Sequence, residues 1–121
     1  NVGAAVNLRI RVRINAPVPR LVLGYMIKDR LGQQMFGTNT HHMEIPLDGL
    51  GAGETIEYRF RFPLNLGPGS YSITTALTSS DTHLADNYEW RDLAFLFIVM
   101  NMNRKTFVGT SWLEPTVEIV R

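Results

Sequence analysis

Hydrophobic and polar residues alternate with a period of two along much of the chain. In VNLRIRVRIN, residues 6–15, the apolar positions alternate with asparagine and three arginines. TIEYRFRF, residues 55–62, has isoleucine and aromatic residues on one parity, and threonine followed by three charged residues on the other. Successive side chains of a strand point to opposite faces, so each segment predicts a strand with one buried and one charged face.

Turn signals separate further expected strands in the first half of the chain. A strand is expected from Leu21 to Ile27, and Asp29 and Gly32 in DRLG favour a type I turn with Gly32 in the left-handed conformation. The next expected strand runs from Gln33 to about Thr38. LDGLGAGE and TSSDTHLADN are interpreted as loops because they are rich in glycine and polar residues.

The second half predicts three more strands. LGPGSY is typical of the tyrosine corner of immunoglobulin-like domains, with Tyr71 just inside a strand. The second half of WRDLAFLFIV is apolar on both faces, which indicates a central strand, and EPTVEIV predicts a last strand. Seven or eight short strands without helical periodicity predict an all-β fold, an immunoglobulin-like antiparallel β-sandwich.

Composition limits the organisation and the classes of partner. A length of 121 residues with 45% hydrophobic content predicts one domain, residues 1–121, and the start at Asn1 favours a fragment of a longer chain. The absence of cysteine excludes disulfides and thiolate zinc sites. A formal charge of +1 provides no overall field for nucleic acid, and no apolar run is long enough to span a bilayer.

Catalytic and metal-binding motifs are not found in the sequence. GLGAGET lacks the lysine of a phosphate loop, and no serine lies in a G-x-S-x-G elbow, so neither catalysis nor a cofactor is expected. His41 and His42 are adjacent, and neighbours on a strand point to opposite faces. With His83 the only other histidine, no metal site is expected.

A mixture of flat rings and planar hydrogen-bonding groups forms the first candidate site. Sugar rings use both, because an aromatic face contacts their C–H groups while amide, imidazole and guanidinium groups bind their hydroxyls. The alternative is that the two tryptophans cap the core, since tryptophan is usually well buried. The candidate carbohydrate-binding residues are Tyr88, Trp90, Trp112, Asn39, His41, His42 and Arg91.

The arginine faces form a second candidate site, which would bind phosphate or an acidic sugar, such as an anionic cap, through paired hydrogen bonds. The alternative is a solvated sheet face whose charge is balanced by Glu57 and Glu118 across strands. The candidate residues are Arg9, Arg11, Arg59 and Arg61.

Three segments together resemble one protein family. GYMIKDRLGQQMFGTNT, LGPGSYSITTAL and WRDLAFLFIV are similar to the C-terminal carbohydrate-binding domain of Wzt-type ATP-binding subunits of bacterial O-antigen polysaccharide ABC transporters. The resemblance covers about Leu21 to Met100, and it rests on the combination of DRLG, FGTNT and L-x-L-x-x-G-x-Y rather than on any one of them.

The resemblance implies a non-catalytic module behind an upstream ATPase domain, cytoplasmic and peripheral to the inner membrane beside a permease subunit. Its implied task is to recognise the O-antigen polysaccharide, at a modified non-reducing end, and so qualify it for export. The rival function is an immunoglobulin-like protein–protein interaction module.

A homodimer is expected through the C-terminal strand, about Leu113 to Val120. The irregular NMNRKTFVGTSW before it is long enough for this strand to leave its own sheet. Edge strands of a small domain also need covering. The resemblance implies the same, because transporters of this family carry two copies of the ATP-binding subunit.

Overall fold

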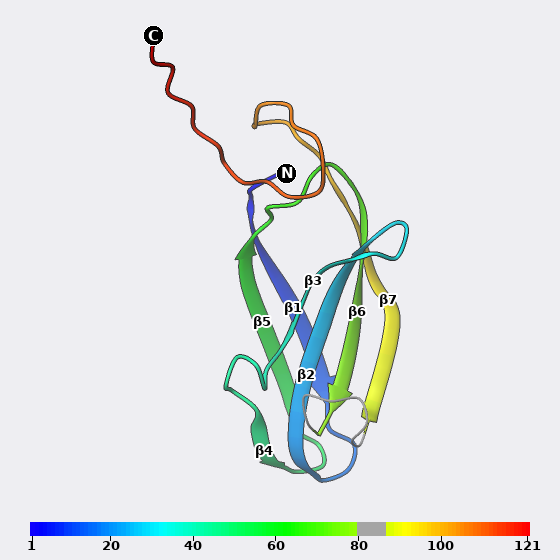
Figure 1. Ribbon diagram of the computed structural model, residues 1–121. Coiled ribbons are helices and arrows are strands. Elements are labelled where there is room, and N and C mark those ends of the chain that lie inside the picture. Colours follow the sequence, from blue (N-terminus) through cyan, green and yellow to red (C-terminus); the bar gives the residue numbers. More distant parts are fainter. Residues whose placement is uncertain (80–86) are drawn as a thin grey trace.

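The computed structural model describes residues 1–79 and 87–121, of which residues 87–93 are described by their backbone alone. Within these ranges the chain forms strands and no helix, arranged in two layers (Figure 1). The predicted all-β, antiparallel sandwich is therefore confirmed. The strands are β1 (Ala5–Arg13), β2 (Val18–Asp29), β3 (Gln34–Asn39), β4 (Leu47–Leu50), β5 (Thr55–Pro63), β6 (Gly69–Thr78) and β7 (Asn87–Val99).

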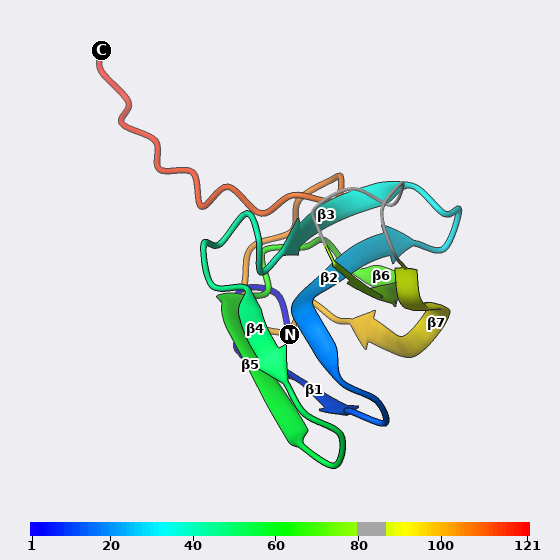
Figure 2. The same cartoon turned by 90° about the horizontal axis from the view of Figure 1, so that it is seen from below.

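The two layers are unequal in size. One sheet consists of β1 and β5, and the other has the order β3-β2-β6-β7, with β4 paired to the start of β2. All pairings are antiparallel. The view along the strands shows β1 and β5 against one face of the larger sheet, with β1 on the side of β7 (Figure 2).

The core lies between the sheets and follows the predicted parity. Tyr25 of β2 and Tyr71 and Ile73 of β6 are buried against Phe60 of β5, with the rings of Tyr25 and Phe60 4.8 Å apart. The opposite parity of β1 and β5 remains exposed and carries the arginines. Burial of one parity therefore fixes the register of β1 and β5, because a slip by one residue would bury the arginines.

The turn between β2 and β3 is the one the sequence predicts. The N–H of Gly32 donates to the carbonyl oxygen of Asp29 over 3.0 Å, and Gly32 adopts φ +82°. The Asp29 carboxylate accepts the N–H groups of Leu31 and Gln33. Its side chain therefore holds the turn closed.

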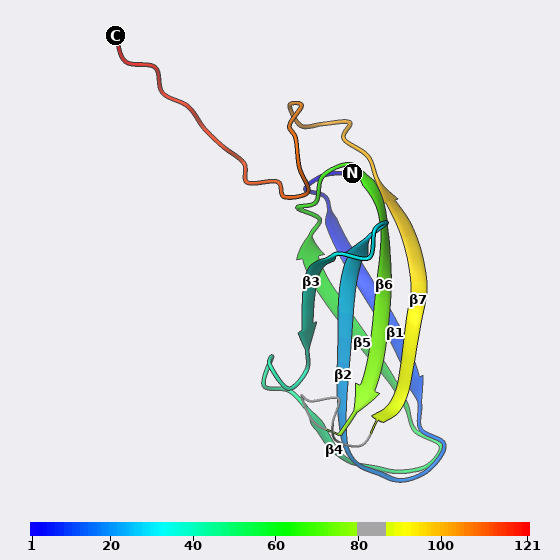
Figure 3. The same cartoon turned by 45° about the vertical axis from the view of Figure 1, so that its right-hand side comes forward.

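Three predictions for single segments are wrong. LDGLGAGE is not all loop, because Leu47–Leu50 forms β4. β7 is an edge strand rather than a central one, and its Leu96 and Ile98 are 66% and 71% exposed. EPTVEIV pairs with no strand among the described residues and extends away from the sandwich (Figure 3).

No helix in the part of the chain that the structure describes is long and apolar enough to cross a membrane.

Candidate functional site

The outer face of the five-stranded sheet is lined along its centre by short side chains. On β6, Tyr71 and Ile73 point into the core, so the alternate positions face outward. These outward positions, Ser72, Thr74, Ala76 and Thr78, are nevertheless buried. The shortness of their side chains places them below those of the neighbouring strands, so β6 forms the floor of a depression.

A hollow of about 510 Å³ opens at one end of this floor. We call it the β6 hollow. Its floor carries the three hydroxyls of Ser70, Ser72 and Thr74, which alternate along one face of β6. Its residues are Lys28, Asp29, Arg30, Gly32, Ser70, Tyr71, Ser72, Thr74 and Leu96.

The strand registers explain why these residues meet. Ser72 pairs with Lys28 of β2 on one side and with Leu96 of β7 on the other. Asp29, Arg30 and Gly32 come from the β2–β3 turn, which borders the hollow at its end. The hollow is thus lined by hydroxyls below, cationic groups on one wall and an aliphatic side chain on the other.

The hollow can bind a polar, uncharged or anionic molecule of small-ligand size. Hydroxyls both donate and accept hydrogen bonds, and lysine and arginine donate only. A volume of 510 Å³ lies in the usual range for small-molecule pockets. Asp29 is already occupied by the turn it holds, so we do not assign it to a ligand.

Asn39, His41 and His42 lie where β3 ends. The amide oxygen of Asn39 accepts the N–H of His42 over 2.7 Å, and His41 Nδ1 lies 3.2 Å from a guanidinium nitrogen of Arg20. Thr40 between them is fully buried, and its hydroxyl accepts the N–H of Leu23 over 3.1 Å. Much of the polarity of FGTNTHH therefore serves to end β3 and start the turn that follows.

Of the predicted residues, the side chains of Tyr88, Trp90 and Arg91 lie outside the described part of the structure, as does the whole of His83. Their backbone belongs to β7, where Trp90 pairs with Ala76. Gly24 pairs with Ala76 and also with Asn39. Asn39, Gly24, Ala76 and the backbone of Trp90 therefore lie side by side on four adjacent strands, in one row across the sheet. Three strand spacings put about 14 Å between Asn39 and the backbone of Trp90.

The structure does not bring Trp112 to this row. Its backbone N–H donates to the carbonyl oxygen of Asn65, and its ring packs on Phe107, with centroids 4.9 Å apart, beside the core. Asn65 comes just before the start of β6, where Gly69 pairs with Val99, so Trp112 lies near that end of the sandwich. Asn39 aligns with Ala76, which is near the other end of β6. Trp112 thus caps the core, as the alternative interpretation proposes.

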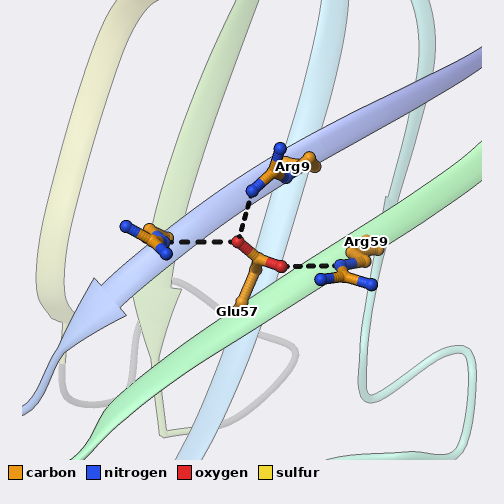
Figure 4. Close-up of polar contacts among 4 residues, drawn as sticks. Arg9, Glu57 and Arg59 are labelled. Atoms are coloured by element: carbon orange, nitrogen blue, oxygen red, sulfur yellow. Dashed lines mark hydrogen bonds and ion pairs between the residues drawn. The ribbon is translucent and has the colours of Figure 1, made fainter.

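The arginines lie on the outer face of the other sheet, on the opposite side of the sandwich. The carboxylate of Glu57 accepts Arg9 at 2.9 Å, Arg11 at 3.2 Å and Arg59 at 2.6 Å (Figure 4). Hydrogen bonds from Arg9 and then Arg59 lower the pKa of Glu57 to about 2. We call Arg9, Arg11, Arg13, Arg59 and Arg61 the arginine face.

The arginine face has one carboxylate for its five guanidinium groups, and this carboxylate pairs with three of them, so the predicted balance is incomplete. Glu57 does bridge the strands, but Glu118 lies in the exposed C-terminal segment and makes no ion pair within the described ranges. Because the arginine face and the β6 hollow are on opposite sides, one small ligand cannot contact both.

The residues of the β6 hollow were not among those selected from the sequence. The signal was present in GSYSITTALT, where Ser70, Ser72 and Thr74 alternate with the apolar parity. Small polar residues on the outward parity of a strand are also what a solvated face shows. The strand order places β6 between β2 and β7, and only this order distinguishes the floor of a hollow from a solvated strand face.

Among the described residues, no three histidine, aspartate or glutamate side chains are grouped so that they could hold a metal ion.

Comparison with known proteins agrees with this architecture. Residues 1–113 match the family described as the Wzt C-terminal domain. A crystal structure of the C-terminal domain of Wzt superimposes with a TM-score of 0.83 at 17% identity, covering 98% of this chain and 72% of that chain. No curated protein matches the sequence. With 113 of its 121 residues matched, the chain belongs to the Wzt C-terminal domain family.

Proposed function

We propose that this chain, a non-catalytic domain of an ABC transporter, is a carbohydrate-binding module that recognises O-antigen polysaccharide and qualifies it for export. The observation that carries the proposal is the β6 hollow, a depression of about 510 Å³ with hydroxyls along its floor. The family match supports the transporter context, and the hollow supports the proposal of a sugar-binding site.

The chemistry of the hollow suits a pyranose ring. The hydroxyls of Ser70 and Ser72 can exchange hydrogen bonds with sugar hydroxyls, and Leu96 offers an aliphatic surface to ring C–H groups. Lys28 and Arg30 on the wall add donors that favour an electron-rich or anionic substituent. This combination of an apolar surface and a few polar groups is typical of small-molecule sites.

Recognition of the modified non-reducing end is the finer part of the proposal. The β2–β3 turn borders the hollow at one end, so a chain that entered along β6 would stop there. The rest of the polymer would follow the floor towards Ala76, in the row shared by Asn39 and the backbone of Trp90. Tyr88, Trp90 and the His41–His42 pair would then contact later sugars.

The family match supports the proposed assembly. The chain would sit behind an upstream ATPase domain, peripheral to the inner membrane on its cytoplasmic side, with the transporter's permease as a further partner. Two copies would form a homodimer through their C-terminal segments. The exposed apolar residues of residues 113–120 support the exchange, since no contact within the described chain covers them.

Calorimetric titration of the 121-residue chain with purified O-polysaccharides, with and without their terminal modification, tests the function. Filling the hollow by Ser72→Leu or Ser70→Leu should weaken binding about tenfold or more, because a leucine displaces the sugar and removes a hydroxyl. Thr55→Leu makes a similar change on the outer face of β5 and should leave affinity unchanged. Unchanged binding by both folded hollow variants would contradict the assignment of the site.

A second candidate function is an immunoglobulin-like protein-interaction module. It is favoured by the exposed apolar side chains along and after the β7 edge, Leu96, Ile98, Met100 and Met102. Such a row is typical of a protein-binding surface. Failure to bind any O-polysaccharide in the titration would favour this second function.

A further inference from the structure

We infer that the arginine face is a second polysaccharide-binding surface, which takes a linear sugar chain that carries acidic groups, phosphates or carboxylates, along its length. The class of partner rests on the proposed function, whereas the surface is separate from the β6 hollow and lies on the other side of the sandwich. The arrangement of the arginines, the donors they leave free and the composition of their two strands carry the inference.

The arginines form a narrow line along the outer face of β1 and β5. Arg61 lies at one end, opposite Asn7, and Arg13 lies six residues further along β1. The other three arginines lie between these two ends. Six residues of a strand span about 20 Å, whereas the two strands are only about 5 Å apart. The cationic surface is therefore elongated along the strands, which suits a linear molecule.

The central arginines are placed where like charges meet. Arg9 and Arg59 lie directly opposite each other across the strand pair, and like charges at opposed positions destabilise a sheet. The carboxylate of Glu57 relieves this repulsion, because it accepts both guanidinium groups and that of Arg11 (Figure 4). One carboxylate among these arginines leaves an excess of positive charge, which a bound anion would neutralise.

The ion pairs leave most of the guanidinium donors free. Arg11 and Arg59 contact Glu57 through Nε, so within the described ranges their terminal nitrogens make no ion pair. Their side chains are 75% and 62% exposed. Arg13 and Arg61 are exposed and make no ion pair with any residue that the structure describes. Guanidinium groups bind phosphate and carboxylate oxygens through paired hydrogen bonds, so this face is supplied with donors for several acidic groups.

The charge of the chain is divided unevenly between this face and the rest. Five arginines and Glu57 give the arginine face a formal charge of +4. The whole chain carries twelve basic and eleven acidic residues, so the remaining seven basic and ten acidic residues give −3. An acidic polymer is therefore attracted to the arginine face and repelled by the rest of the surface.

The composition of the face favours an acidic glycan over a single-stranded nucleic acid or a membrane. The outer positions of β1 and β5 carry no aromatic side chain, whereas single-stranded nucleic acids stack their bases on aromatic rings. These positions also carry no large aliphatic side chain that could enter a bilayer. Acidic groups along a glycan need only the guanidinium donors, and the family match supports a polysaccharide as the partner.

Dextran sulfate, with neutral dextran as the matched probe, tests the inference in a calorimetric titration of the 121-residue chain. We expect dextran sulfate to bind at least tenfold more tightly than dextran, with an affinity that falls as the salt concentration rises. R13E/R61E should lower this affinity about tenfold or more, because two donors of charge-assisted hydrogen bonds are lost. K105E/R121E makes the same change of net charge at exposed positions outside the arginine face and should retain an affinity close to that of the native chain.

The variants also separate this surface from the β6 hollow. Ser72→Leu should leave the binding of dextran sulfate unchanged, and R13E/R61E should leave the binding of an uncharged O-polysaccharide unchanged. If Ser72→Leu does not weaken O-polysaccharide binding while R13E/R61E weakens dextran sulfate binding, the assignment of the hollow fails and the arginine face stands. Equal losses in R13E/R61E and K105E/R121E, or equal affinities for dextran and dextran sulfate, would overturn the inference.

A further probe distinguishes a membrane as the source of the acidic groups. Binding to vesicles of phosphatidylglycerol, without binding to dextran sulfate, would overturn the inference and assign the arginine face to a lipid surface. Circular dichroism checks the fold of R13E/R61E. If that variant unfolds, R13Q/R61Q replaces it, because it removes the two charges without adding carboxylates, and the same loss of affinity is expected.

Discussion

The hydroxyl of Tyr71 donates a hydrogen bond to the carbonyl oxygen of Gly67 over 2.7 Å, across the connection from β5 to β6. The bond is buried, and burial followed by the charge of Asp29 raises the pKa of the Tyr71 hydroxyl. Tyr71→Phe leaves the Gly67 carbonyl oxygen without this donor. We expect it to lower the free energy of unfolding by about 1–2 kcal/mol in urea denaturation.

Tyr58→Phe is the matched control for this substitution. Tyr58 is half-buried, and its hydroxyl oxygen is buried without a hydrogen-bond partner in the described structure. Removing an unpaired polar group should leave stability unchanged or increase it. Equal losses in the two variants would show that ring packing, and not the Tyr71–Gly67 bond, determines the effect.

The tyrosine corner also illustrates what the sequence can predict. Tyr71 and the LGPG turn form a local motif, and the alternating faces of β1 and β5 are local as well, so they are recognised in one pass along the chain. β4 was missed because LDGL has one glycine and pairs with β2 by three positions only, Val18, Arg20 and Leu21. A strand this short carries almost no periodicity.

Strand order accounts for the remaining differences. The sequence FLFIV is apolar on both parities, which normally indicates a strand buried on both faces. β7 nevertheless lies at the edge of its sheet, and its Leu96 and Ile98 are exposed. The β6 hollow depends on Ser72 lying between Lys28 and Leu96, three residues from distant segments. Which strands become neighbours is a property of the whole fold, so residue types on one strand could not reveal it.

The Glu57 cluster makes stability depend on pH. The ordinary pKa of 4.5 falls to about 2 in the folded chain, so folding favours the ionised form. The contribution is fully present above pH 4.5 and is lost as the pH falls towards 2. Urea denaturation at a series of pH values should show a decline in this window that is smaller in Glu57→Gln.

Glu44→Gln, at an exposed position between β3 and β4, is the control for removing a carboxylate. It should retain the decline of the native chain. The same decline in Glu57→Gln as in the native chain would exclude Glu57 as its source.

Gly67 is expected to tolerate no side chain. A Cβ there would overlap the carbonyl oxygen of Gly109 and approach the Cα of Thr110 to 3.2 Å. Both contacts are backbone, so the segment that carries Trp112 would have to move. Gly67→Ala should cost about 1–3 kcal/mol and expose Trp112, with a red shift of its fluorescence.

Gly51→Ala provides the comparison, because its Cβ would meet only the Glu54 carboxylate at an ordinary 3.7 Å. We expect a change within about 0.5 kcal/mol. A stable Gly67→Ala variant with native fluorescence would mean that the 109–112 segment is not held against Gly67 in solution.

Removing residues 113–121 should abolish the proposed homodimer and leave a monomer. Within the described residues they pair with no strand of their own chain, and they include Leu113, Val117 and Ile119, each more than 80% exposed. Burying such a side chain against a partner stabilises by roughly 1.5–3 kcal/mol, and strand exchange repeats the gain in both copies. Truncation after Trp112 keeps the ring that caps the core, so the sandwich itself should remain folded. Light scattering gives the mass of both forms, and circular dichroism checks the fold of the truncated one. A monomeric full-length chain would refute the dimer. If the truncated chain is still a dimer, the interface lies on another surface, and the β7 edge is the next one to test.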